Sequence, residues 1–216
     1  MNIILDFIPL GRRNRPAGRN GLNFITIHNT GNTNRGANAR AHASFLRGND
    51  AANAPVSWHY TVDDVEVFQH LPDAETAFHA GDGNGPGNTQ SIGIEICENS
   101  DGNLLQATNN AVKLTAALCK KHGIPIENIV QHNRWSGKDC PSRLRRNQPY
   151  SWTEFLNRVR AEGSISPEEA TIINAIADGI ITSKDHWLGV LRGTIAPNPA
   201  FIKIMMDNAH RKIRGL

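Results

Sequence analysis

The sequence predicts an α/β domain followed by a small all-helical region, and three observations support this fold class. Short β-rich segments alternate with longer segments of helical periodicity through residue 162. From residue 163 to the end, only helical patterns occur. The chain has 216 residues with 39% hydrophobic and 20% charged content, which is enough for one well-cored domain and an appendage.

The predicted strands are short and rich in β-branched residues. The first covers residues 22–28 (LNFITIH) and ends at His28. The segments SWHYTVD and VEVFQHL are typical of a hairpin. The clearest strand is 91–99 (SIGIEICEN), in which three isoleucines share one face and Glu95 points to the other. A last short strand, IVQH, ends at His132.

Helical segments separate and follow these strands. ANARAHASFLRG carries its apolar residues on one face. Residues 104–122 form a long amphipathic helix that Gly123 ends, and SWTEFLNRVRAEG forms another with Ser151 as its cap. Residues 81–88 (GDGNGPGN) are so rich in Gly, Asn and Pro that we expect a surface loop without regular structure.

The region from 163 to 216 begins with a short linker. Residues 166–169 (SPEE) combine a cap, a proline and two acidic residues, which predicts the start of the first of three short helices. A unit of about 50 residues is near the lower limit for an independent core. We therefore expect an appendage that docks on the first domain or on a second copy of the chain.

Charge and targeting signals restrict the classes of function. The formal net charge of +3 favours an anionic polymer as partner without singling out nucleic acid. The apolar run near the N-terminus precedes its charges, which is not the layout of a signal peptide. No stretch reaches the ~18 apolar residues of a membrane span. We expect synthesis in the cytoplasm without a signal peptide, no membrane insertion, and release by another factor if the chain works outside.

Three residues at segment ends form a candidate metal site. His28, His132 and Cys140 provide two imidazoles and a thiolate, a ligand set of catalytic zinc that leaves the fourth position for water. His132 and Cys140 are eight residues apart in a segment with Gly and Pro, so a loop must bring them together. The alternative is a set of hydrogen-bonded structural histidines. Cys97 is a competing thiol, although its place in an isoleucine-rich strand favours burial.

Five further residues are candidates for catalysis or substrate binding. If the strand face that carries Glu95 forms the floor of a cleft, its carboxylate can accept a proton from a metal-activated water. The alternative is a carboxylate exposed to solvent on a sheet that is covered on one face only. Lys138 would stabilise the oxyanion formed when water attacks a carbonyl. Tyr60 would add a phenol donor, with strand packing as the alternative. His79 and Asn29 are second candidates for holding substrate.

Five motifs occur in a characteristic order: ITIHNTGN, WHYTVDD, AFHAG, SIGIEICEN and QHNRWSGKDCPSRL. Together they resemble the zinc-dependent N-acetylmuramoyl-L-alanine amidases, more narrowly the phage and prophage endolysins of Gram-positive bacteria and related autolysins. The resemblance covers about residues 7–160. It implies a mixed central β-sheet flanked by helices, the fold shared with peptidoglycan recognition proteins.

The resemblance also implies an activity. The substrate would be the amide between the lactyl group of N-acetylmuramic acid and the L-alanine of the stem peptide in bacterial peptidoglycan. In some relatives an aspartate replaces the thiolate ligand, and here the register favours Cys140 over the adjacent Asp139. The roles that the resemblance assigns are Zn²⁺ binding for His28, His132 and Cys140, catalysis for Glu95 and Lys138, and lining the cleft for Tyr60 and His79.

Two other classes of function compete with this interpretation. A recognition module would use the same fold without cutting, but it would be expected to lack the zinc ligands. A metal-dependent nuclease is suggested by two His-Asn dipeptides and by arginine clusters, and it predicts salt-sensitive DNA binding. We expect no nucleic-acid partner. Residues 1–162 would be the zinc amidase domain, and 163–216 would serve wall targeting, self-association or packing.

Overall fold

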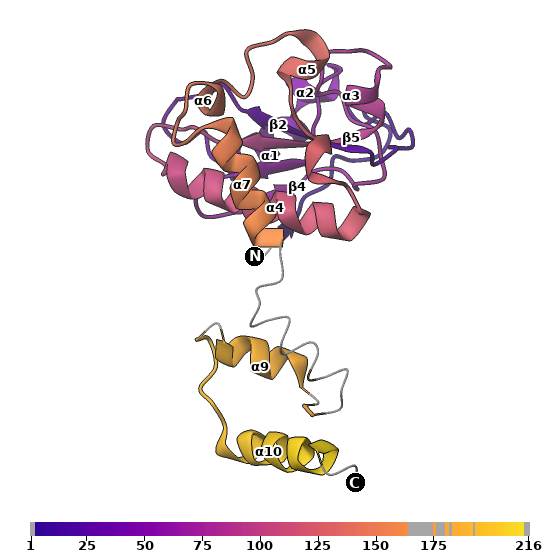
Figure 1. Cartoon of the computed structure of the whole chain (residues 1–216). Helices are drawn as coiled ribbons and strands as arrows, with labels where there is room; N and C mark the ends of the chain where they lie inside the picture. Colours follow the sequence, from indigo (N-terminus) through magenta and orange to yellow (C-terminus); the bar gives the residue numbers. More distant parts are fainter. Residues whose placement is uncertain (1–2, 164–174, 176–179, 182, 192, 214–216) are drawn as a thin grey trace. The chain divides into compact units, whose positions relative to one another are not determined.

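The computed structural model describes residues 3–163, 175, 180–181, 183–191 and 193–213 of the chain. The chain divides into two compact units, Met1–Gly163 and Ser164–Leu216 (Figure 1). The predicted domain boundary, between residues 162 and 163, lies one residue before this division. The function assigned to each part stays a prediction.

The first unit is built on a mixed β-sheet of six strands among the described residues. The sheet order is β1-β4-β3-β5-β2-β6. The pair β3–β4 is antiparallel, as the hairpin predicts, and the other neighbours are parallel. The predicted α/β class with a mixed sheet is therefore confirmed. The strands are β1 (Ile3–Leu5), β2 (Phe24–Asn29), β3 (Tyr60–Val62), β4 (Val67–Gln69), β5 (Ser91–Ile96) and β6 (Ile129–Gln131).

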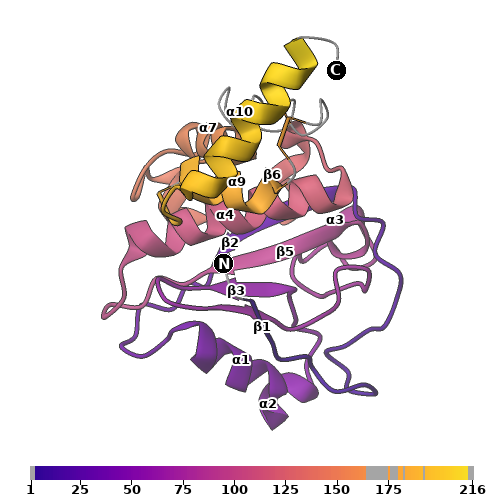
Figure 2. The same ribbon diagram turned by 90° about the horizontal axis from the view of Figure 1, so that it is seen from below.

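Helices cover the two faces of this sheet differently (Figure 2). The long helix α4 (Leu104–His122) and α7 (Trp152–Gly163) pack on one face, and α1 (Ala39–Arg47) packs on the other over β3 and β4. The shorter elements of this unit are α2 (Asn49–Ala52), α3 (Pro86–Thr89), η1 (Ile126–Asn128), α5 (Asn133–Ser136) and α6 (Ser142–Arg145).

The main hydrophobic core lies between the sheet and the pair α4–α7. Ile92, Ile94 and Ile96 of β5 are fully buried in it, as their shared face predicts. Because side chains alternate along a strand, residues between them on β5 point to the face that carries α1. Burial of the isoleucines thus directs His28 of β2 and Glu95 of β5 to the opposite surface, where the functional site lies.

The helix ends follow the predicted signals, with one exception in a loop. Gly123 ends α4 in a left-handed conformation, φ 67°, and Ser151 caps α7 by accepting a hydrogen bond from the N–H of Glu154 at 3.1 Å. The prediction for residues 81–88 is wrong in part. A single helical turn, α3, starts at Pro86, and Asn88 within it is buried because its side chain binds neighbouring backbone groups.

The second unit contains α9 (Lys184–Leu191) and α10 (Pro199–Ile213) among its described residues. Within it, the side-chain amide of Asn208 on α10 donates to the carbonyl of Ile180 at 3.0 Å. The predicted helix start at 166–169 lies outside the described residues. In the part of the chain that the structure describes, no helix has both the length and the apolar character needed to cross a membrane.

A buried carboxylate ties the sheet to α4. Asp73 Oδ1 accepts hydrogen bonds from the hydroxyl of Tyr60 at 2.5 Å and from Gln69 Nε2 at 3.0 Å. Its Oδ2 accepts from Lys121 Nζ at 2.7 Å and His122 Nε2 at 2.8 Å. Burial alone would raise the pKa of Asp73, but these hydrogen bonds outweigh it and the pKa is lowered.

Replacing Asp73 with asparagine is expected to lower the free energy of unfolding at pH 7 by about 1–3 kcal/mol. The ion pair with Lys121 contributes least to this loss, because Lys121 is largely exposed. Because the pKa of Asp73 is lowered in the folded state, its carboxylate stabilises the fold at pH values above its unfolded pKa of about 3.9. This stabilisation is lost as the pH falls through the pKa of the folded state. Urea unfolding at pH 7 and in acid should therefore show a difference between the two proteins that shrinks in acid. Asp50→Asn, exposed on α2, is the control, and an equal difference at both pH values would contradict the assignment.

Candidate metal centre and active site

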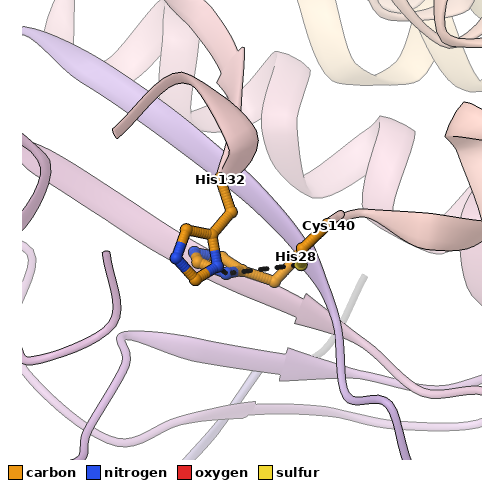
Figure 3. A group of neighbouring side chains, drawn as sticks. All are labelled: His28, His132 and Cys140. Atoms are coloured by element: carbon orange, nitrogen blue, oxygen red, sulfur yellow. Dashed lines mark hydrogen bonds between the residues drawn. The ribbon is translucent and has the colours of Figure 1, made fainter. Parts of the chain in front are cut away.

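The three predicted ligands converge at one end of the sheet (Figure 3). His28 lies on β2, His132 directly follows the neighbouring strand β6, and Cys140 lies in the loop beyond α5. The two Nδ1 atoms are 3.0 Å apart, and Cys140 Sγ is 3.9 Å from His28 Nδ1. All three side chains are buried, and their ligand atoms lie within 4.8 Å of one another. Parallel pairing of β2 with β6 brings the two histidines together.

The same three residues have the protonation properties of metal ligands. Burial, followed by the charges of neighbouring histidines and Lys138, holds the pKa of His28 well below its ordinary value. Burial also lowers the pKa of His132, so both imidazoles are neutral and keep a lone pair. Burial raises the pKa of the Cys140 thiol to about 12, a cost that a bound cation would offset. The set can therefore hold a metal ion.

Outer contacts fix the orientation of both imidazoles. His28 Nε2 lies 3.0 Å from His79 Nδ1, and His132 Nε2 lies 2.9 Å from the carbonyl oxygen of Ala80. The backbone N–H groups of His79 and Ala80 both donate to Asn88 Oδ1 at 2.8 Å. Because each Nε2 atom already has a partner, the Nδ1 atoms face Cys140 and are available to a metal. In metal-bound histidines, the second ring nitrogen is held in the same way by a neighbouring group.

The predicted cleft residue His79 also lines the pocket beside the ligands. Its ring packs directly over β5 because Gly93 has no side chain there: a Cβ on Gly93 would lie 2.8 Å from the ring. The support that Asn88 gives to His79 was missed by sequence reasoning. Its only sequence signal was an asparagine inside the segment 81–88, which predicted a loop.

The loop between the second and third ligands is closed by Asn133. Its side-chain amide donates to the carbonyls of Gly137 at 3.0 Å and Lys138 at 2.9 Å. Its backbone N–H donates to the carbonyl of Cys140 at 3.0 Å. Asp139, by contrast, is exposed and pairs with arginines of the next segment, which agrees with the predicted register at Cys140.

Asn133→Ala is expected to weaken the affinity for added Zn²⁺ by about 10–100-fold, because the loop that carries Cys140 loses its two side-chain clamps. Competition with a chromogenic chelator measures this affinity. Asn157→Ala on α7, whose exposed side chain accepts a hydrogen bond from exposed Arg160, is the control. Unchanged affinity in Asn133→Ala would mean that the loop holds its shape without the clamps.

Glu95 lies beside the ligand set. It is paired with His28 in the β2–β5 register, and its Oε1 is 3.7 Å from His28 Nδ1. Its Oε2 is buried and has no hydrogen-bond partner among the described residues. Burial raises the pKa of Glu95 to about 8, against a smaller lowering effect of Lys138. Lys138 is exposed at the rim of the same pocket.

This pocket has a volume of about 440 Å³. Part of its lining is polar and consists of His79, Glu95, His132 and Lys138 together with Thr30 and Asn32. The rest of the lining is mostly apolar, and sequence reasoning missed it because it comes from α1 and three loops. Its residues are Ala37, Ala41, His42, Phe45, Val56, Trp58 and Phe78.

Two predicted substrate residues, Tyr60 and Asn29, lie elsewhere. Tyr60 pairs with Ile94, while Thr61 pairs with Glu95, so Tyr60 points into the core under α4 and its hydroxyl binds Asp73. Asn29 follows His28 and therefore has the opposite orientation; its Oδ1 accepts from the N–H of Arg143 at 3.1 Å. Neither residue is in the pocket lining, and their part in binding substrate stays a prediction.

The competing thiol Cys97 is buried against α1 with Ala39, Ala43 and Phe68. Burial raises the pKa of Cys97, and its Sγ is 3.9 Å from His42 Nδ1. It is not part of the ligand set formed by the described residues, as its strand position predicted.

A buried pair of histidines and a cysteine, beside a carboxylate that lines a pocket, defines a candidate metallohydrolase centre. Comparison with known families agrees with this class. The family model described as N-acetylmuramoyl-L-alanine amidase matches residues 18–143, and the chain belongs to this family.

Individual relatives are similar over most of the first unit. The N-acetylmuramoyl-L-alanine amidase XlyA of Bacillus subtilis strain 168 is 49% identical over 164 residues, covering 76% of this chain and 53% of XlyA. CwlH of the same strain is 45% identical over 177 residues, covering 82% of this chain and 68% of CwlH. The solved catalytic domain of XlyA superposes with a TM-score of 0.69 at 49% identity, covering 74% of this chain and 99% of that domain. The chain thus spans about half the length of XlyA.

Proposed function

We propose that this chain hydrolyses the amide bond between N-acetylmuramic acid and the L-alanine of the stem peptide in bacterial peptidoglycan, as an endolysin or autolysin. The observation that carries the proposal is the convergence of His28, His132 and Cys140 beside Glu95, with His132 and Glu95 lining one pocket. Membership of the amidase family and the likeness to the catalytic domain of XlyA support the same activity.

The resident metal in this proposal is zinc. Two imidazoles and one thiolate suit its borderline-soft character. A tetrahedral zinc ion, with bonds of about 2.05 Å to nitrogen and 2.3 Å to sulfur, separates its ligand atoms by roughly 3.3–3.6 Å. The separations here are 3.0 Å between His28 and His132 and 3.9 Å between His28 and Cys140, so small side-chain adjustments would suffice. When bound, zinc supplies Lewis-acid polarisation of a carbonyl and lowers the pKa of water to about 7.

Side chains of the protein carry out the proton transfer, stabilise the developing charge and orient the ligands. In its ionised form, which a bound cation beside it would favour, Glu95 takes a proton from the attacking water and delivers it to the departing amine of L-alanine, through the Oε2 that has no partner among the described residues. Lys138 places a positive charge at the pocket rim and offsets the charge that develops on the lactyl oxygen. His79 holds His28 in orientation. The products are a free lactyl carboxylate and a peptide with an amino-terminal alanine.

This activity is tested by the new groups that appear in digested Gram-positive peptidoglycan. Hydrolysis at the proposed bond releases free α-amino groups of alanine and no reducing sugar ends. Reducing ends would indicate cleavage of the glycan instead. Wall binding without either product would favour the alternative, a recognition module.

A nuclease is disfavoured by the same arrangement, because the rim of the pocket carries Lys138 as its single lysine or arginine among the lining residues described. A gel-shift series at low salt would reveal DNA binding if it occurred. We further propose that residues 1–162 form the zinc amidase domain, which acts on the wall after release from the cytoplasm. For residues 163–216, wall targeting, self-association and packing remain the three proposals, which sedimentation and wall pull-down of the full chain would separate.

A further inference from the structure

The turn between the second and third proposed ligands carries a tryptophan, Trp135, that has no role in the chemistry above. Trp135 lies in α5, the short helix that directly follows His132 and leads into the loop that ends at Cys140. Its side chain is half-buried, whereas the residues on either side of it in the sequence are exposed. The contacts of Trp135 therefore bear on how this turn is attached to the rest of the unit.

The indole of Trp135 is hydrogen-bonded to the sheet at β2. Its Nε1–H donates to Thr26 Oγ1 at 2.9 Å, and Thr26 Oγ1 lies 2.5 Å from Ser91 Oγ at the start of β5. Thr26 and Ser91 are both fully buried. Because Thr26 is two residues before His28 on the same strand, the two side chains point to the same face of the sheet. Trp135 is thus attached to the strand face that carries the first ligand.

An aromatic ring and a glycine border the indole on other sides. The ring of Phe24 meets it edge-on, with centroids 5.3 Å apart and planes at 81°. The backbone of Gly87 in α3 comes so close that a Cβ there would lie 2.7 Å from Trp135 Cγ. The same Cβ would lie 2.5 Å from the side chain of Ala80, whose carbonyl oxygen contacts His132 Nε2. The indole therefore packs between β2 and the segment that orients the second ligand.

We propose that Trp135 is a positioning residue for the metal site, because it fixes α5 on the sheet and so determines where the ligands on either side of α5 lie relative to β2. The inference rests on the proposed function, since it takes the three ligands to bind zinc. The contacts of Asn133 lie within the loop itself, so Trp135 supplies a different constraint. Metal affinity depends on how well the ligands are held in place before the ion binds. Loosening α5 should therefore weaken zinc binding even when every ligand is present.

The variants Trp135→Phe and Thr26→Val test this role through zinc affinity, measured on the metal-free full chain by competition with a chromogenic chelator. Phenylalanine keeps a ring beside Phe24 and removes the N–H donor, and valine keeps the shape of threonine and removes the acceptor. We expect the Kd for Zn²⁺ to rise about tenfold or more in Trp135→Phe and about threefold or more in Thr26→Val. Both changes break the same hydrogen bond, so the Kd of the double variant should stay within about twofold of that of Trp135→Phe.

Trp152→Phe on α7 is the matched control. Trp152 is also half-buried, and it stacks on Phe155 with centroids 5.5 Å apart and packs against the main core. The control therefore loses the same ring atoms at a site that does not touch the ligand loop. Its Kd for Zn²⁺ should stay within about twofold of the value for the parent chain. An equal rise of the Kd in Trp152→Phe would overturn the proposal, since zinc affinity would then follow general stability instead of the position of α5.

The role of Trp135 and the proposed function fail in different ways. If the parent chain does not hold Zn²⁺, the proposed metal centre fails, and the Trp135 proposal fails with it. If the parent chain binds Zn²⁺ and releases peptides with amino-terminal alanine, the proposed function stands. A Kd for Trp135→Phe within about twofold of the parent value would then reject the role of Trp135 alone.

Discussion

Cys140→Ala is expected to lose stoichiometric zinc and at least about 10³-fold of the amidase activity, because two imidazoles alone leave the ion weakly held and in the wrong geometry. The thiol is buried, 3.9 Å from His28 Nδ1, and no other described sulfur lies in the ligand set. Zinc content by elemental analysis and turnover on purified peptidoglycan measure the two losses in the same preparation.

Two variants make this result specific. Cys119→Ala removes a partly buried thiol on α4 that packs against the main core, so zinc and activity should be retained. Asp139→Asn removes the neighbouring carboxylate, which is exposed and paired with Arg145 and Arg146. Loss of zinc in Asp139→Asn with retention in Cys140→Ala would show that the register of the third ligand is assigned wrongly.

Glu95→Gln is expected to lower turnover by about 10²–10⁴-fold while zinc content and wall binding are retained. Glutamine has nearly the same shape but cannot carry a proton from water to the leaving amine. Glu95 Oε1 is 3.7 Å from His28 Nδ1, and Oε2 has no partner among the described residues, so few other interactions change. Single-turnover rates on peptidoglycan, with zinc measured in parallel, separate the chemical step from metal loss.

The control for Glu95 is Glu154→Gln on α7. That carboxylate pairs with Arg158 on the helix surface and should be dispensable for turnover. Full activity in Glu95→Gln would remove the residue from the mechanism. A loss of zinc together with activity would instead assign Glu95 to holding His28 in place.

Local sequence patterns predicted most of the elements that position the site. The alternation in SIGIEICEN orients Glu95 away from the isoleucines, and this determines which face of β5 is chemical. His28 and His132 stand at the ends of short strands, and parallel pairing of those strands brings them together. These features depend on periodicity within one segment, which a sequence displays directly.

The sequence was less informative where the register between segments decides which way a side chain points. Tyr60 and Thr61 were equally available to the cleft until the pairing of β3 with β5 placed Thr61 opposite Glu95. Asn29 was judged by its proximity to His28 in sequence, although adjacent strand residues face opposite ways. The apolar wall with Phe45 and Trp58, and the support of His79 by Asn88, come from segments whose mutual placement is tertiary.

The most direct test of the account is mass spectrometry of the material released from purified Gram-positive peptidoglycan by the full chain, with and without a zinc chelator. We predict stem peptides that begin with L-alanine, their absence after chelation, and their return when Zn²⁺ is added to the parent chain but not to Cys140→Ala. Release of the same peptides in excess chelator, or by Cys140→Ala at the parent rate, would contradict it.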